Sequence, residues 1–489
     1  MTTSNLPIVL YAVPFLAALL AAATGWYVRG AARALAATAT AVTAGVAALL
    51  LARVMAEGTL MTPLGGWPPP LGIALVVDRL SALMAVLISG VAAVTVMGSG
   101  GHVRQELPGR QTLYYACVLL ATAGLLGIAL TGDLFNLFVH LEVVSLAAYA
   151  LVAAGGRGAP RAAMAYLIIG TVGATLYLLG VGFLYSATGT LNMADTARLI
   201  GGAHPRLVAV GTLLIVAGLG IKMALFPLHR WMAAAYQLAP AGSAAFMAPL
   251  VTKVSAYALI RVLFWVHGEE ALRSGLALDL LAWAGAAAIV AGGAMALAEP
   301  DLRRLLAYSS IGQMGIIMLG VGLANTAGMT GAVLHIASDA LMKGVLFLAA
   351  GSALLRFGVT RVEDLNRLRG RTPWLGLAVT VAGLSLIGVP PLGGFYGKWY
   401  VLNGAIQEGR WVFVAALAVG SLATIGYVSR ILERLYFAAP GTEQSPAPHG
   451  ESLAVGACLA LAACVVLLGL GNESVVRSLV WPALPEVGP

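Results

Sequence analysis

The residues of this chain best suited to proton chemistry are its lysines, because only four of the 28 basic residues are lysines. Lys222, Lys253, Lys343 and Lys398 all fall inside apolar segments, whereas nearly all arginines fall in loops or at segment ends. A lysine in a medium of low dielectric constant can release its proton, while arginine stays charged. A codon bias towards arginine explains a surface without lysine but not four lysines at membrane depth. The pattern favours proton transfer over structural ion pairing alone.

Two further titratable groups share a segment with one of these lysines. The stretch HIASDALMKGVLF places His335, Asp339 and Lys343 at positions i, i+4 and i+8. On a helix this spacing stacks the three side chains on one face, about 6 Å apart per step. Such a row can conduct protons where water molecules bridge it.

The apolar segment TGDLFNLFVHLEVVSLAAYALVA carries three more titratable residues, Asp133, His140 and Glu142. A charged side chain at bilayer depth costs several kcal/mol, so Glu142, deep in the segment, requires a partner. Asp133 lies about 13.5 Å nearer the segment's start, where it can either cap the helix or handle protons. His140 is either a proton site or a packing residue.

Two segments are predicted to be broken helices. In IKMALFPLHRW, Pro227 follows Lys222 by five residues, and in GVPPLGGFYGKWY, Pro390 and Pro391 precede Lys398. Proline removes a backbone donor and clashes with the preceding turn. Interrupted segments in both halves of a membrane protein are typical of inverted-repeat transporters. His229, beside the first break, is a further accessory candidate.

Composition places these segments in a polytopic membrane protein. The chain has 489 residues, of which 60% are hydrophobic and 10% charged, and its mean hydropathy is +0.92. The sequence predicts an all-α fold of one membrane domain, residues 1–489, with about fourteen spans at 7–28, 31–54, 77–99, 111–131, 133–154, 161–186, 206–229, 241–265, 275–298, 303–323, 329–355, 373–403, 411–436 and 452–471.

The charge distribution predicts the orientation of the chain. The loops after the first span and after every second span thereafter, together with the helix ends beside them, hold about sixteen of the 24 arginines. The positive-inside rule places these loops in the cytoplasm and both termini outside, with the chain in the cell's inner (cytoplasmic) membrane. The net charge of +8 then reflects topology rather than nucleic-acid binding. The three cysteines lack metal-ligand spacing, and we expect neither a metal site nor a cofactor.

Six ordered motifs resemble a known family: GDLFNLFVHLEVVSLAAYALV, GIKMALFPLHRWMAAAY, APLVTKVSAYALIR, DLRRLLAYSSIGQMG, HIASDALMKGVLFLAAG and GVPPLGGFYGKWYV. They are similar to motifs of the antiporter-like subunits of respiratory complex I and of Mrp sodium/proton antiporters, over about residues 77–436. The resemblance implies inverted five-helix repeats at helices 4–8 (111–265) and 9–13 (275–436), with helices 7 and 12 broken. It also implies a proton path through Glu142, Lys222, Lys253, His335, Lys343 and Lys398.

Two positions depart from the family pattern. His140 stands where Mrp relatives generally carry an aromatic residue, and Asp339 stands where many relatives carry a second histidine. Asp339 can still relay protons, but pairing with a nearby lysine would hold that lysine in its charged form.

The motif forms most resemble the D-type subunit of Mrp Na⁺/H⁺ antiporters. They imply a proton-translocating, non-enzymatic subunit that acts with other membrane subunits, protons and Na⁺. The alternative is the equivalent subunit of a complex I-type NADH:quinone oxidoreductase or of a membrane-bound hydrogenase. A stand-alone solute transporter and a purely structural membrane subunit also remain open.

Overall fold

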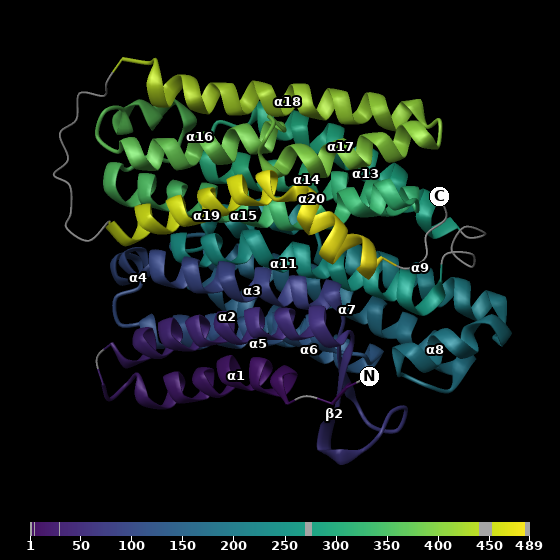
Figure 1. The fold of residues 1–489 in the computed structure, drawn as a ribbon. Coiled ribbons are helices and arrows are strands. Elements are labelled where there is room, and N and C mark those ends of the chain that lie inside the picture. The colour runs from purple at the N-terminus through teal and green to yellow at the C-terminus, as the bar shows by residue number, and fades with distance from the viewer. Residues whose placement is uncertain (1, 4, 29, 269–275, 440–451, 485–489) are drawn as a thin grey trace.

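The fold is a bundle of roughly parallel helices with one small sheet (Figure 1). The computed structural model describes residues 2–3, 5–28, 30–268, 276–439 and 452–484. The predicted all-α polytopic fold is confirmed. The further division into inverted repeats at 111–265 and 275–436 stays a prediction.

Within the described residues, thirteen helices are long and apolar enough to cross a membrane. These helices are α1 (Leu6–Thr24), α2 (Ala31–Glu57), α3 (Arg79–Gly98), α5 (Gln111–Leu130), α6 (Leu134–Ala153), α7 (Ala159–Thr188), α9 (Pro205–Lys222), α11 (Ala241–Val262), α13 (Leu276–Ala298), α14 (Leu302–Leu323), α15 (Thr326–Phe357), α18 (Trp411–Tyr436) and α19 (Ser452–Leu470).

The fourteenth expected segment is present as two shorter helices, α16 (Pro373–Ile387) and α17 (Gly393–Gln407). The shorter elements between and after the spans are α4 (Gly100–Glu106), α8 (Met193–Leu199), α10 (Arg230–Leu238), α20 (Asn472–Val475), and the helical turns Leu64–Gly66, Ile200–Gly202, Leu263–His267, Val362–Leu368, Val476–Val480 and Trp481–Ala483.

Both predicted helix breaks are confirmed. Helix α9 ends at Lys222 and α10 begins only at Arg230, so that Pro227 lies in the irregular backbone between them. Ala224, in the same stretch, has a φ of +57°, a left-handed conformation that non-glycine residues rarely adopt. Irregular backbone leaves carbonyl groups outside the helical ladder, and at membrane depth such groups need protein or water partners.

The sheet was not expected from the sequence. Strands β1 (Thr2–Thr3), β2 (Leu60–Pro63) and β3 (Ala74–Val77) pair in the order β1-β2-β3, with β2 and β3 antiparallel. Figure 1 shows β2 and α8 at one end of the bundle and α4 at the opposite end. The strands are only two to four residues long, too short for a clear alternating pattern against the apolar spans.

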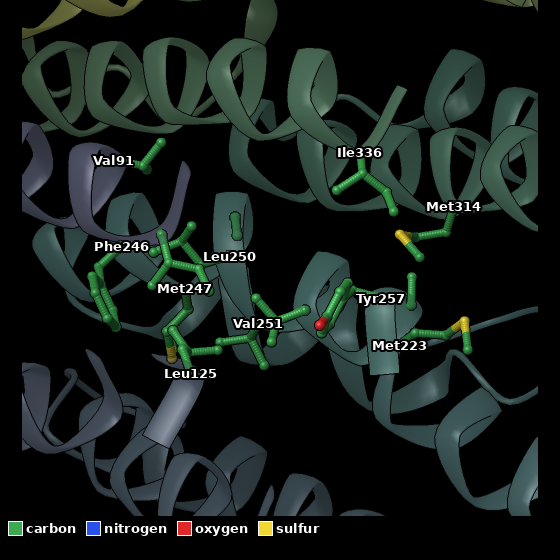
Figure 2. Packing of buried hydrophobic residues seen from close by; sticks show 14 of the residues in the cluster. Val91, Leu125, Met223, Phe246, Met247, Leu250, Val251, Tyr257, Met314 and Ile336 are labelled. Atoms are coloured by element: carbon green, nitrogen blue, oxygen red, sulfur yellow. The ribbon is translucent and has the colours of Figure 1, made fainter. Parts of the chain in front are cut away.

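Helices α11 and α15 form the centre of the bundle. Every residue of α11 is buried, and α11 packs directly against α15. Figure 2 shows the α11 side chains Met247, Val251 and Tyr257 in one buried cluster that also holds Leu125 of α5 and Met314 of α14. The charged side chains of Lys253, Asp339 and Lys343 on these two helices are therefore enclosed by protein rather than by lipid.

Glycines bring α13 and α14 into close contact. A β-carbon added at Gly315 would lie 2.6 Å from the carbonyl oxygen of Gly285 and 2.8 Å from the backbone nitrogen of Ile289. Backbone atoms cannot move aside as a flexible side chain can, so this crossing admits only a small residue.

We expect Gly315→Val to destabilise the folded protein by about 1–3 kcal/mol, because the added atoms overpack a backbone contact. Thermal unfolding of the purified protein in detergent measures the effect. Gly182→Val is the matched control, since Gly182 is also helical and a β-carbon there meets nothing within 4 Å. Equal stability of the two variants would contradict the packing argument.

Candidate functional site

The first ion pair joins Glu142 of α6 to Lys222 at the end of α9. The Lys222 Nζ atom lies 2.9 Å from Glu142 Oε1 and also donates a 2.7 Å hydrogen bond to Ser145 Oγ. The lysine side chain is 5% exposed and the glutamate side chain is 26% exposed. Glu142 therefore has the partner that its depth requires, and the pair has one partly accessible edge.

The helix break places Lys222 for this contact. Because α9 stops at Lys222, the lysine is the last helical residue before the irregular backbone. The indole nitrogen of Trp231 on α10 donates a 2.9 Å hydrogen bond to the carbonyl oxygen of Ile221. This bond ties the two halves of the broken helix together beside the ion pair, and it satisfies a carbonyl at the end of α9.

The second ion pair joins Lys253 of α11 to Asp339 of α15. Lys253 Nζ lies 2.7 Å from Asp339 Oδ2, and both side chains are 0% exposed. Lys253 Nζ also donates a 3.0 Å hydrogen bond to the carbonyl oxygen of Ala248. The sequence indicated that Asp339 could pair with a nearby lysine. In the structure its partner is Lys253, which lies on a different helix, α11.

Lys343 lies four residues beyond Asp339 on α15, and its recorded hydrogen-bond partners are uncharged. Its Nζ atom donates a 3.1 Å hydrogen bond to the carbonyl oxygen of Leu306 and another to Ser309 Oγ, both on α14. On the other side of Asp339, His335 Nε2 lies 2.8 Å from Gln313 Oε1. All three members of the predicted row are completely buried on one helix, which places them in the bundle centre.

Lys398 lies at the second helix break. Its Nζ atom donates hydrogen bonds of 2.8 and 3.0 Å to the carbonyl oxygens of Leu386 and Ile387. These carbonyls are at the C-terminal end of α16, where a helix has unsatisfied acceptors and a partial negative charge. A β-carbon added at Gly397 would lie 2.7 Å from His335 Nδ1, so the histidine packs against the turn that precedes Lys398.

The helices that carry these groups contact one another in sequence. The Glu142–Lys222 pair joins α6 to α9, α9 packs on α11, α11 on α15, and α15 on α17. All seven residues predicted for proton translocation thus lie on a continuous series of packed helices: Glu142, Lys222, Lys253, His335, Asp339, Lys343 and Lys398.

The accessory candidates lie on α6 or in the first break, but their recorded contacts are with other residues. Asp133 caps α6, because its Oδ1 atom accepts a 2.7 Å hydrogen bond from the backbone nitrogen of Asn136. The His140 ring packs edge-on against Tyr11 with 5.2 Å between the ring centroids, two residues and hence about 200° around the helix from Glu142. The His229 ring stacks on Phe226 in the first break.

Sequence reasoning missed the hydroxyl and amide partners, which are Ser145, Ser309 and Gln313. Ser145 follows Glu142 by three residues, so helical spacing could have placed it on the same face. No comparable signal links Ser309 or Gln313 to α15, since that contact depends on how α14 packs. Over the described residues, no group of three or more His, Cys, Asp or Glu side chains could hold a metal ion.

The chain is similar in sequence to two kinds of membrane-complex subunit. A family model described as NADH:quinone oxidoreductase/Mrp antiporter, TM, matches residues 131–424. NADH-quinone oxidoreductase subunit N of Desulforudis audaxviator is 47% identical, over 86% of this chain and 86% of that protein. The D-type Na⁺/H⁺ antiporter subunit of Bacillus subtilis is 31% identical, over 88% of this chain and 86% of that protein.

Solved structures agree with these matches. A chain of the membrane-bound sulfane sulfur reductase, an archaeal respiratory membrane complex, superimposes with a TM-score of 0.90 at 30% identity, covering 97% of this chain and 96% of that one. A chain of the Mrp complex from Dietzia sp. DQ12-45-1b superimposes with a TM-score of 0.88 at 26% identity, with 98% of both chains covered.

We expect Asp339→Leu to destabilise the protein by about 3–5 kcal/mol, because it leaves the Lys253 ammonium buried without its counter-ion. The double variant Lys253→Met with Asp339→Leu should regain most of this loss, since it removes both charges. Thermal unfolding of the purified protein measures both effects. Independent, additive losses in the double variant would show that the two groups do not stabilise one another.

Proposed function

The chain belongs to the NADH:quinone oxidoreductase/Mrp antiporter transmembrane family, and we propose that it moves protons through the bilayer along its Glu/Lys/His series. Its relatives are subunits of multi-subunit membrane complexes. The chain is an antiporter-like membrane subunit rather than a catalytic enzyme. The proposed path runs from Glu142 and Lys222 to Lys398.

One observation carries this proposal: the lysine at the first helix break is bound to a partly exposed carboxylate on another helix. An opposite charge within several Å favours the charged lysine, while removal from water opposes it. Separating Glu142 from Lys222 would therefore promote proton release from Lys222. A change in a neighbouring subunit, or the arrival of a cation near the partly exposed Glu142, supplies such a separation.

The next acceptor in the proposed path is Lys253. Asp339 pairs with Lys253 and precedes Lys343 by one helical turn. In a low-dielectric interior, one carboxylate compensates one ammonium far better than two. We therefore assign Asp339 the role of a shared counter-ion, which pairs with whichever of the two lysines holds the proton.

The path ends at Lys398, beside the second break. Water bound to the irregular backbone supplies the remaining links, since such backbone is tolerated where it lines a water-filled cavity. His335 lies between the Asp339 turn and the break and serves as a relay there. The driving force is the transmembrane potential together with the ion gradients, and one charge crossing 100 mV is worth about 2.3 kcal/mol.

For the host complex, we propose a Na⁺/proton antiporter of the Mrp type. The form of the six sequence motifs supports this host, as does the similarity to an Na⁺/H⁺ antiporter subunit and to a chain of a Mrp complex. A second host is a complex I-type NADH:quinone oxidoreductase or a related respiratory complex. The 47% identity to the oxidoreductase subunit, against 31% to the antiporter subunit, favours this second host. In either host, cation specificity lies partly in other subunits.

The proposed location is the cell's inner (cytoplasmic) membrane, with both termini outside. The arginine-rich loops support this orientation through the positive-inside rule. The same loops define the cytoplasmic side of the proton path.

We expect Lys222→Ala to abolish proton translocation while the complex still assembles, because the variant lacks the amine that binds a proton beside Glu142 and releases it to the next residue of the path. The measurement is proton movement into inside-out membrane vesicles, followed with a pH-sensitive dye. Arg206→Ala is the matched control, since Arg206 lies exposed at the start of the same helix. Normal transport by an assembled Lys222→Ala variant would refute the mechanism.

Co-purification distinguishes the two hosts. An affinity-tagged chain extracted in mild detergent should bring other antiporter subunits with it if the host is a Mrp complex. Recovery of iron–sulfur or quinone-reducing subunits instead would assign the second host. Recovery of the chain alone with full transport activity would contradict both.

A further inference from the structure

We propose that a buried polar cluster around His102, at the arginine-rich end of α15, is a proton inlet that feeds Lys343. This inference rests on the proposed proton path and adds an entry point to it. The cluster is formed by α4, the start of α5, the α10–α11 turn and the last turns of α15. None of its residues was among the sequence-predicted site residues.

His102 is the centre of this cluster. Its Nε2 atom lies 3.0 Å from Ser352 Oγ on α15, and its side chain is nearly enclosed, at 7% exposure. A β-carbon added at Gly351 would lie 3.3 Å from His102 Nδ1 and 2.8 Å from the Ala241 β-carbon. The close packing of α4, α11 and α15 thus fixes the ring against the end of the central helix.

Several polar atoms in and beside this cluster have no hydrogen-bond partner among the described residues: Ser99 Oγ, His102 Nδ1, Tyr114 Oη and Tyr236 Oη. Ser99 and Tyr114 both lie against Gly242, because a β-carbon there would be 3.3 Å from the Ser99 β-carbon and 2.8 Å from Tyr114 Oη. Buried polar atoms are satisfied by protein or by ordered water. A site with several such atoms close together is suited to bind water.

One charged group, Glu106, lies at the partly exposed rim of the cluster, and a second, Arg303, is buried beside it. Glu106, half-buried on α4, accepts a 2.7 Å hydrogen bond from the backbone nitrogen of Ala241, and burial raises the pKa of its carboxyl although this bond and Arg303 lower it. Arg303 is anchored by the carbonyl oxygens of Tyr236 and Ala239. A carboxyl with a raised pKa at the rim can collect protons from solution.

The electrostatics keep His102 in the form that relays protons. Burial and, to a smaller extent, the positive charge of Arg303 lower the pKa of His102 to about 4. The ring is therefore neutral at neutral pH and offers one donor and one acceptor. One ring nitrogen accepts a proton from water while the other donates a proton to Ser352 Oγ, whose hydroxyl proton passes to the next water.

The cluster leads towards Lys343. Ser352 follows Lys343 by nine residues on α15, which is about 13.5 Å along the helix axis. Tyr236 lies beside this interval, since its ring packs against Phe347, one helical turn after Lys343, with 5.8 Å between centroids. Water molecules between Ser352, the Tyr236 hydroxyl and Lys343 complete the route. Hydrogen bonds through such bridging water are nearly as favourable as direct hydrogen bonds between protein groups.

The test uses His102→Gln in the assembled complex, in inside-out vesicles that expose the arginine-rich side to the medium. Glutamine retains a hydrogen bond to Ser352 but cannot relay a proton. We expect proton uptake to slow about 10- to 100-fold at neutral pH, as for loss of a positioned proton-transfer group. Because uptake then limits transport, the variant's rate should rise as the medium is acidified, by up to tenfold per pH unit, against a much flatter wild-type profile.

Matched variants separate relay from packing. Ser352→Thr keeps the hydroxyl and should retain most of the activity, whereas Ser352→Ala should slow uptake as His102→Gln does. His204→Gln, exposed before α9, is the neutral control. Wild-type rates in His102→Gln, or a rate loss that is the same at every pH, would overturn the inlet. If Lys222→Ala also transports normally, the proposed function itself fails; if only His102→Gln does, the inlet alone fails.

Discussion

The constraint on which the structure depends is the cost of a charge inside a membrane bundle. Lys253 and Asp339 have no exposed side-chain surface, and each is tolerable only because the other lies 2.7 Å away. This contact requires α11 and α15 to pack directly, and that packing buries every residue of α11. The central pair thus joins helices that the family resemblance assigns to different repeats.

The four lysines are held in two chemically different ways. Lys222 and Lys253 face carboxylates, whereas the recorded partners of Lys343 and Lys398 are carbonyl and hydroxyl groups. A carboxylate favours the charged amine, while a carbonyl or hydroxyl can accept from a charged or a neutral one. Along the proposed path, two lysines paired with carboxylates are thus followed by two bound to neutral groups. Moving a single carboxylate from one lysine to the next would change which lysine holds its proton more firmly. The two helix breaks position Lys222 and Lys398, and the second break also supplies the carbonyl oxygens that Lys398 contacts.

The similarity extends to subunits of complexes with different chemistry. Relatives named as an NADH-quinone oxidoreductase subunit and as a Na⁺/H⁺ antiporter subunit match nearly the same length of this chain. A shared fold therefore does not choose between hosts. The buried series of lysines and acids depends only on this chain's own residues, which is why a proton path can be proposed while the host is decided by co-purification.

The sequence by itself determined the all-α membrane fold, both helix breaks and the lysines, because apolar length, proline and isolated charge are local signals. Glu142 was recognisable as a buried acid in need of a partner, and Asp339 as an acid that could pair with a nearby lysine. Which lysine each acid contacts was decided only by the tertiary structure, since Asp339 is joined to Lys253 across 86 residues of chain. The contacts of the hydroxyl partners Ser145 and Ser309 and the small sheet likewise arise from packing, whereas the cap at Asp133 is a local contact with Asn136 and one of the two roles that the sequence indicated. A periodic pattern fixes which face of a helix is buried, but not which neighbour that face meets.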